Sequence, residues 1–201
     1  MSFISPKMCG LLINNISVHL YIDSTVINNN MSDNLTSLQP KDVQIDDKLL
    51  KKTFLEHLNY IYYGKHHLIK FFTEVKDIAK LQVLKMAIQE GIDDTKKQIA
   101  QMDEIFETIN ERPSQTNTLG IKAITLEAYL AAIKAGKTPL ERDVFILFYL
   151  QQIEGIEITY FKVLRNLAKA IGYSNKFLDQ TFDIAVDNNI LFETIYKEYI
   201  S

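Results

Sequence analysis

Tryptophan is missing from this sequence of 201 residues, and cysteine, proline and glycine are scarce. The single cysteine, Cys9, excludes an internal disulfide and is compatible with a reducing compartment, so we expect a cytoplasmic protein. Only 7 glycines and 4 prolines are present, which is few for the many turns of an all-β fold. The composition therefore favours long helices.

Long apolar runs and an excess of basic residues are missing as well. No run approaches the roughly 18 apolar residues of a membrane span, so we expect no membrane insertion. The 22 Lys and Arg residues are outnumbered by 25 Asp and Glu residues, and the formal net charge is −3. Nucleic-acid binding needs a basic surface, so we expect no such partner. The balance of 47% hydrophobic and 23% charged residues is typical of a soluble globular protein.

The first 46 residues differ from the rest of the chain. Residues 32–47 are polar and contain Pro40, which is typical of a linker or a poorly ordered tail. The apolar stretch from Leu11 to Ile22 is interrupted by two asparagines, which a signal peptide does not tolerate well. We therefore expect a tail over residues 1–46 and one domain over 47–201. A start of translation at Met31 is an alternative that would remove residues 1–30.

From Asp47 onward the pattern is helical. Apolar residues recur at alternating spacings of four and three, which predicts long amphipathic helices that pack along a seam. The four seams run from Phe54 to Val75, from Ile88 to Ile109, from Ile146 to Ile171 and from Leu178 to Tyr199.

Signals for helix ends agree with these seams. Thr138 as N-cap, Pro139 and Glu141 form a capping box before the third long helix, and Gly172 provides its C-terminal stop. We expect the second long helix to stop at Pro113.

The connections indicate how the helices are ordered. The first and second helices are joined by a short linker, as are the third and fourth, so each pair predicts an antiparallel hairpin. The segment from Glu111 to Thr138 is longer and contains a fifth, shorter helix over Ile121–Ala135. One long crossover between two hairpins predicts an all-α, ferritin-like four-helix bundle.

Polar residues within the seams are the candidate functional residues. Lys65, Glu157 and Asn188 occupy seam positions, Glu154 lies one turn before Glu157 on the same face, and Asp94 is next to the seam. Buried charges are costly unless they are paired, so these residues meet one another, contact water or hold a metal.

Ferritin-like di-metal sites take a carboxylate from each of two helices and Glu-x-x-His from each of the other two. Here Asp94, Glu154 and Glu157 are the only residual ligand positions, and the histidines between residues 57 and 67 fall outside the seam. We therefore expect no cofactor, with iron or manganese as the alternative. A physical hypothesis follows, in which the Lys65 ammonium replaces the metal cation and neutralises Glu157 or Glu154.

Three segments of the chain serve as landmarks for a comparison with known families. They are the segment from Gln98 to Pro113, the segment from Gln152 to Ile158, and the Leu-Ala-x-x-Ile-Gly run at 167–172. With these landmarks in order, the stretch from about Lys51 to Tyr199 resembles the YciE/YciF-like family of ferritin-like proteins. The resemblance implies a helical bundle, often dimeric, with a poorly defined, stress-associated function. It also implies a dinuclear metal centre in the better-preserved members.

The chain departs from this family pattern at the metal positions. Where the resemblance implies Tyr-x-Ala-Glu, the first helix reads Tyr62-Tyr63-Gly64-Lys65, so a cation replaces the acid. The second helix has Gly91 to Asp94 in place of His-x-x-Glu, and the fourth has Ile184-Ala185 in place of an acidic pair. These changes indicate a degenerate site.

Three classes of function remain open. The first is a non-catalytic, homodimeric, stress-associated protein whose di-metal site is degenerate and metal-free. The second is a metal-handling or oxidising protein that uses Asp94, Glu154, Glu157 and a further ligand such as Asp187. The third is an adaptor for another protein. The number of ligands favours the first class.

A surface for a partner is expected on the short helix. Its apolar residues Leu126, Tyr129, Leu130 and Ile133 either form a dimer surface or cap the bundle.

Overall fold

The computed structural model describes residues 45–115, 118–133 and 138–200. Within these ranges the chain forms five helices and no strand, which confirms the all-helical class. They are α3 (Asp47–Ile78), α4 (Gln82–Thr108), α5 (Leu119–Ile133), α6 (Pro139–Ala170) and α7 (Lys176–Ile200). The tail predicted for residues 1–46, with the alternative start at Met31, lies outside the described residues except for its last two positions.

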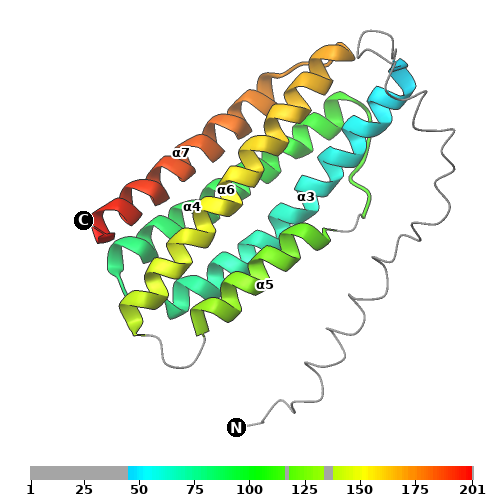
Figure 1. Ribbon diagram of the computed structural model, residues 1–201. Helices are drawn as coiled ribbons and strands as arrows, with labels where there is room; N and C mark the ends of the chain where they lie inside the picture. The colour runs from blue at the N-terminus through cyan, green and yellow to red at the C-terminus, as the bar shows by residue number, and fades with distance from the viewer. Residues whose placement is uncertain (1–44, 116–117, 134–137, 201) are drawn as a thin grey trace, which may run out of the picture. The chain divides into compact units, whose positions relative to one another are not determined.

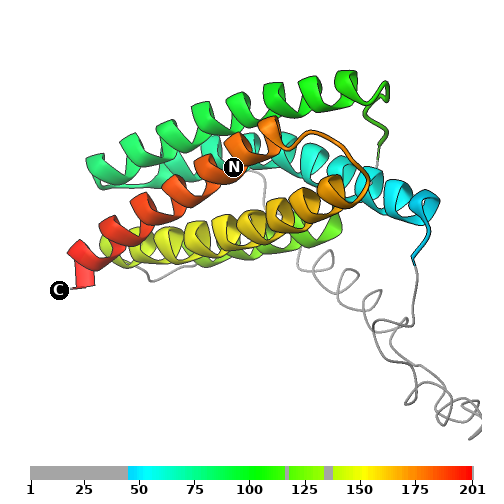
Figure 2. The ribbon, with the colours of Figure 1, turned by 90° about the horizontal axis from the view of Figure 1, so that it is seen from above.

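The four long helices form a ring. Helix α3 packs against α4 and α6, and α7 also packs against α4 and α6, so α4 and α6 occupy opposite corners. Both run in the same direction along the bundle, as Figure 1 and the view from above in Figure 2 show. The connection between them therefore passes from one end of the bundle to the other. Helix α5 lies within this connection and packs on α3 and α6.

The helix ends show which sequence signals act. The Thr138 hydroxyl accepts a hydrogen bond from the Glu141 amide at 3.2 Å, and the Glu141 carboxylate accepts one from the Thr138 amide, so the capping box is confirmed. Gly172 ends α6 with a φ of 75°. Helix α4, however, ends at Thr108 and not at Pro113. Asn110 adopts a φ of 55°, a left-handed conformation that short polar residues tolerate, and it stops the helix before the proline.

The core consists of the predicted seams with changes of register in α4 and α6. Phe54, Phe72, Phe161 and Phe192 are among its largest side chains and have no exposed surface or about 1%. In α4 the seam passes through Gln98, which is fully buried, while Ile99 is only partly buried. In α6, Phe161 and Ala168 are fully buried, while the predicted seam residues Tyr160 and Leu167 are only partly buried.

Two contacts fix the elements around this core. The Asp143 carboxylate on α6 is fully buried and accepts hydrogen bonds from the Lys80 and Leu81 amides at 2.7 to 3.0 Å, which holds the turn between α3 and α4. Gly64 on α3 lets α5 approach closely, because a Cβ at this position would collide with Ile121 Cδ1.

Among the described helices, none is long and apolar enough to cross a membrane.

Candidate functional site

A polar cluster lies in the middle of the bundle and joins all four long helices. The Lys65 ammonium on α3 forms an ion pair with Glu157 Oε2 on α6 and donates a hydrogen bond to Gln98 Oε1 on α4 at 2.5 Å. Gln98 Nε2 in turn donates to the main-chain carbonyl of Thr181 on α7 at 2.9 Å. Lys65, Glu157 and Gln98 are each at most 1% exposed. The hypothesis that Lys65 pairs with Glu157 therefore agrees with the geometry.

Seam positions bring these groups together. The alternation of three and four residues places Lys65 among the apolar side chains of α3, so its four-carbon stem runs through the core. Its ammonium also lies 5.7 Å from the centre of the Phe161 ring, a distance at which the ring face attracts a cation. The side chain is therefore held within the bundle and does not reach solvent.

Glu154 is the second buried carboxyl group of the cluster, one turn before Glu157 and 1% exposed. Burial raises the pKa of Glu154 well above its usual value, and the charge of Glu157 adds to this effect, while Lys65 opposes it. The protonated form is thus favoured. When Glu154 is protonated, the ammonium of Lys65 and the carboxylate of Glu157 balance each other within this cluster.

The other predicted residues are placed differently. Asp94 is 14% exposed in its side chain and pairs with Lys97 on its own helix at 2.7 Å, so it does not join the cluster directly. Its charge still acts on Glu154, whose pKa it helps to raise. Asn188 is buried on α7, as its seam position predicts, and no hydrogen bond joins it to Lys65 or Glu157. Asp187, a candidate fourth ligand, is exposed.

Sequence reasoning missed Gln98 and Thr181 as members of the cluster. Either Gln98 or Ile99 continues the seam between Thr95 and Met102, and hydrophobicity alone selects the isoleucine. The available signal was the ammonium itself, since a buried lysine has three protons to donate and one carboxylate does not satisfy them.

The residues present do not fit a dinuclear metal centre. Glu154 Oε2 and Glu157 Oε1 are buried and accept no hydrogen bond, so two oxygens are free to act as ligands. Both come from one helix, however, and the ammonium of Lys65 lies where a further carboxylate is needed. Within the described ranges, no three His, Cys, Asp or Glu side chains are grouped closely enough to hold a metal ion.

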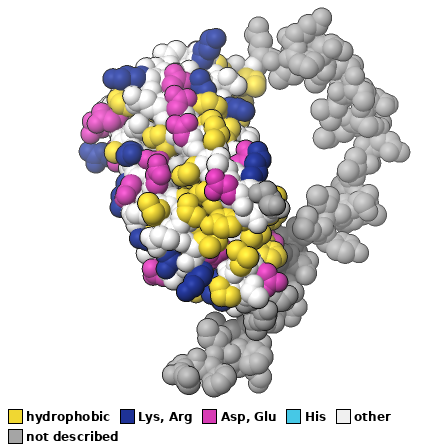
Figure 3. Space-filling model, turned by 90° about the vertical axis from the view of Figure 1, so that its left-hand side faces the viewer, with side chains coloured by type: hydrophobic (Ala, Val, Ile, Leu, Met, Phe, Trp, Pro, Cys, Tyr) yellow, Lys and Arg dark blue, Asp and Glu magenta, His cyan; other side chains and the backbone are white. Residues whose placement is uncertain are grey.

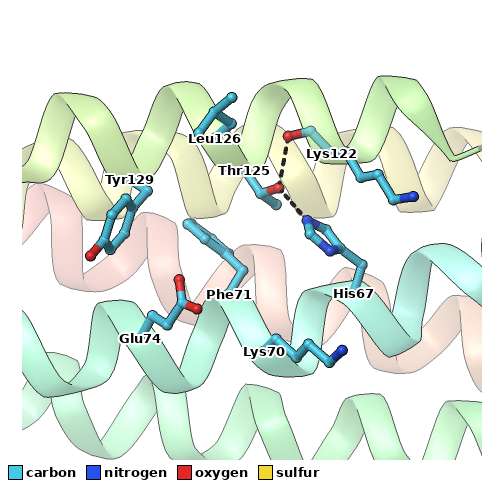
Figure 4. Close-up of a pocket in the computed structure, with 8 residues that line it drawn as sticks. All are labelled: His67, Lys70, Phe71, Glu74, Lys122, Thr125, Leu126 and Tyr129. Carbon is cyan, nitrogen blue, oxygen red and sulfur yellow. Dashed lines mark hydrogen bonds between the residues drawn. The ribbon is translucent and has the colours of Figure 1, made fainter. Parts of the chain in front are cut away.

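The histidines of α3 point away from this cluster. His66 is exposed, and His57 packs edge-on against Tyr160 at 6.0 Å between ring centres. His67 is half-buried and shares a 2.8 Å hydrogen bond with Thr125 Oγ1 on α5. His67 and Thr125 both line a pocket of about 340 Å³ between α3 and α5 (Figure 4). This pocket was not predicted from the sequence.

The fold and the cluster define a class: a helical bundle whose polar core links all four long helices. Comparison with known proteins identifies the family. The family model described as "Domain of unknown function (DUF892)" matches residues 49–189, so the chain belongs to this family. No curated protein matches the chain.

Two solved structures share the fold. The E. coli stress protein YciF has a TM-score of 0.72 at 19% identity, over 75% of this chain and 96% of YciF. YcfI, described as a putative structural protein from Rhodopseudomonas palustris, has a TM-score of 0.70 at 23% identity, over 78% of this chain and 98% of YcfI. The resemblance to the YciE/YciF-like family is therefore confirmed.

Proposed function

We propose that this chain is a non-catalytic, ferritin-like member of its family, in which a lysine replaces the metal of a degenerate di-metal site. The observation that carries the proposal is the buried ion pair between Lys65 and Glu157. A buried carboxylate needs a positive partner, which a metal ion supplies in a carboxylate-rich bundle and the ammonium supplies here. The cluster then holds the four helices together and performs no chemistry.

Metal content of the purified protein tests this proposal. The protein is exposed to Fe(II) in air, loosely bound metal is removed, and the metals that remain are counted by mass spectrometry. We expect less than about a tenth of a metal ion per chain, against about two for an intact di-metal carboxylate site. About two irons per chain would overturn the proposal and establish the alternative, a metal-handling or oxidising protein.

A substitution at Lys65 makes the test sharper. Lys65→Glu replaces the ammonium by a carboxylate beside Glu157 and Glu154, whereas Lys65→Gln removes the charge without adding a ligand. We expect Mn²⁺ or Fe²⁺ to raise the melting temperature of Lys65→Glu but not that of Lys65→Gln or the wild type, because only the first variant has three carboxylates together. A metal-dependent rise in the wild type would contradict a metal-free site.

The cellular role is proposed from the neighbours in fold. YciF is described as a stress protein, and we propose a stress-associated, cytoplasmic role for this chain as well. Its abundance in its own organism is expected to rise under osmotic, oxidative or heat stress. A constant abundance under all three, measured by quantitative proteomics, contradicts this role.

We also propose that the protein acts as a homodimer. Exposed apolar side chains lie along α6 at Phe145, Phe148, Ile156 and Val163, and Leu130 extends the same face onto α5. Figure 3 shows apolar side chains that gather on one face of the molecule with charged side chains around them. A grouped apolar face with a charged border is typical of a protein interface, and a second copy is the simplest partner. An adaptor that binds another protein by this face remains the competing hypothesis.

A further inference from the structure

The pocket between α3 and α5 is separate from the polar core, and its two ends differ in chemistry. One end has the cationic groups Lys70 and Lys122 and the His67 imidazole, and the other has Phe71 and Tyr129 (Figure 4). Its volume of about 340 Å³ falls within the usual range for small-molecule sites, about 300–1,000 Å³.

The two lysines are available for a ligand. Among the described residues, neither Lys70 nor Lys122 forms an ion pair, although Glu74 lies four positions after Lys70 on the same helix. Lys122 also lies in the first turn of α5, where the exposed amide groups of the helix add positive potential. This end of the pocket is therefore suited to one negative charge.

The hydrogen bond of His67 determines which of its ring nitrogens carries the proton in the neutral form. The hydroxyl of Thr125 donates its proton to the main-chain carbonyl of Ile121 at 2.9 Å, so its oxygen is left to accept. Nε2 of His67 is then the donor to Thr125, and Nδ1 carries the free lone pair of the neutral ring. A second proton added at Nδ1 turns this nitrogen into a donor for an anion.

The opposite end limits the kind of anion. Glu74 lies beside Phe71 and Tyr129, so a second negative charge at this end is repelled (Figure 4). Apolar surface from Phe71, Leu126 and Tyr129 suits a hydrocarbon body instead. We propose that this pocket binds a small monocarboxylate, with the carboxylate at His67, Lys70 and Lys122 and an apolar tail toward Phe71 and Tyr129.

His67 reports on this binding. Burial lowers the pKa of His67, and the charges of Lys122 and Lys70 lower it further, while Glu74 acts in the opposite direction. A bound carboxylate opposes the two lysines, so it raises the pKa of His67. By the same linkage, the ligand binds more tightly below the pKa of His67 than above it.

The experiment is an NMR titration of the histidine ring protons of the full chain, with octanoate as the probe and octanamide as its neutral counterpart. The 4 histidines of the chain are distinguished by a His67→Gln variant. With octanoate at up to about 10 mM, a concentration that reveals weak binding, we expect the pKa of His67 to rise by roughly one unit. Octanamide is expected to leave it unchanged.

Matched variants test whether the two pocket lysines bind the carboxylate of octanoate. Lys122→Gln and Lys70→Gln are each expected to weaken octanoate binding roughly fivefold, the effect of one partly screened charge. Lys51→Gln, an exposed lysine on α3 far from the pocket, is expected to leave binding unchanged. All three positions are exposed, so the fold is preserved.

Three results overturn the proposal. The first is a pKa of His67 that octanoate does not move. The second is equal binding of octanamide, which means that the site is apolar only. The third is an equal response to inorganic phosphate, which means that the lysines attract any anion and the apolar end plays no part. Metal content and the Lys65 variants do not enter this test, so it stands apart from the proposed function.

Discussion

At the scale of single residues, the polar core depends on one cation. Lys65 contacts both Glu157 and Gln98, and no other positive side chain of the described residues is buried. The sequence predicted the pair because a lysine and a glutamate both interrupt apolar seams. It did not predict Gln98, because an amide next to an isoleucine gives no sign of which of the two turns inward.

Loss of the ammonium is expected to destabilise the fold strongly. Lys65→Met leaves Glu157 buried without its positive partner, and breaking such a pair costs about 3–5 kcal/mol. The double variant Lys65→Met, Glu157→Gln removes both charges and should recover much of this loss. Unfolding by urea measures the free energies, and Lys70→Met on the exposed side of the same helix is the control. Equal stability of wild type and Lys65→Met contradicts the buried pair.

The carboxyl group of Glu154 gives the stability a dependence on pH. Its folded pKa lies well above the ordinary value of 4.5, so the folded state keeps a proton that the unfolded chain loses. The bound proton contributes fully to the free energy of unfolding below about pH 4.5. Above this pH its contribution decreases by up to about 1.4 kcal/mol per pH unit, until the pH passes the pKa of Glu154 in the folded state.

Glu154→Gln keeps the shape and removes this titration. The difference in the free energy of unfolding between this variant and the wild type is therefore expected to shift in favour of the variant as the pH rises from 5 to 8. Urea unfolding at each pH measures it, with Glu104→Gln at an exposed position as the control. A difference that stays constant over this range shows that Glu154 titrates alike in both states.

At the scale of elements, periodicity predicted the long helices well and their ends less well. The capping box at Thr138 and the glycine at 172 are local signals that act within a few residues, so the sequence reveals them directly. The end of α4 depends on the left-handed conformation of Asn110. Asparagine adopts this conformation only at some positions, so its presence in the sequence does not by itself mark the end of a helix. Helix α5 was expected at 121–135. It begins two residues earlier, at Leu119, and the last two positions of the expected range lie outside the described residues.

The docking of α5 predicts different responses at two helical glycines. A Cβ added at Gly155 on α6 meets no atom within 4 Å, so Gly155→Ala should raise stability by about 0.5–1 kcal/mol through helix propensity. A Cβ at Gly64 collides with Ile121 on α5, so Gly64→Ala should gain less or lose stability.

Thermal unfolding of the two glycine variants measures this difference. The helical signal of both variants should remain that of the wild type before the transition, since neither substitution breaks a helix. An equal gain in melting temperature for Gly64→Ala and Gly155→Ala shows that the Ile121 side chain moves aside at no cost, so that its contact with Gly64 does not constrain the docking of α5.

At the scale of the whole molecule, the sequence predicted the fold and only part of the sites. The number of long helices, the short linkers and the long crossover follow from patterns along the chain. The pocket between α3 and α5 joins residues that are distant in sequence, since His67 and Thr125 lie 58 positions apart. Only the packing of α5 on α3 brings them together, and periodicity within either helix does not reveal it. The apolar face on α6 was missed for a related reason, since a second apolar stripe is read as part of the core.

The apolar face on α6 leads to the prediction for the whole molecule. Phe148 is 48% exposed and Leu130 is 54% exposed, and a second copy of the chain would cover both. Leu130→Glu combined with Phe148→Glu places two charges where the proposed dimer has apolar contacts, and uncompensated charges at an interface core are strongly unfavourable. We expect the wild type to sediment as a dimer and the double variant as a monomer with the same helical content.

Met86→Glu provides the control, because Met86 is 63% exposed on α4, away from the α5 and α6 residues that form this face. This variant should remain a dimer in analytical ultracentrifugation at the same concentration. If it dissociates as well, added negative charge and not the α6 face explains the effect. If the wild type is already a monomer at all concentrations, the face is free for another protein, and the adaptor hypothesis replaces the homodimer.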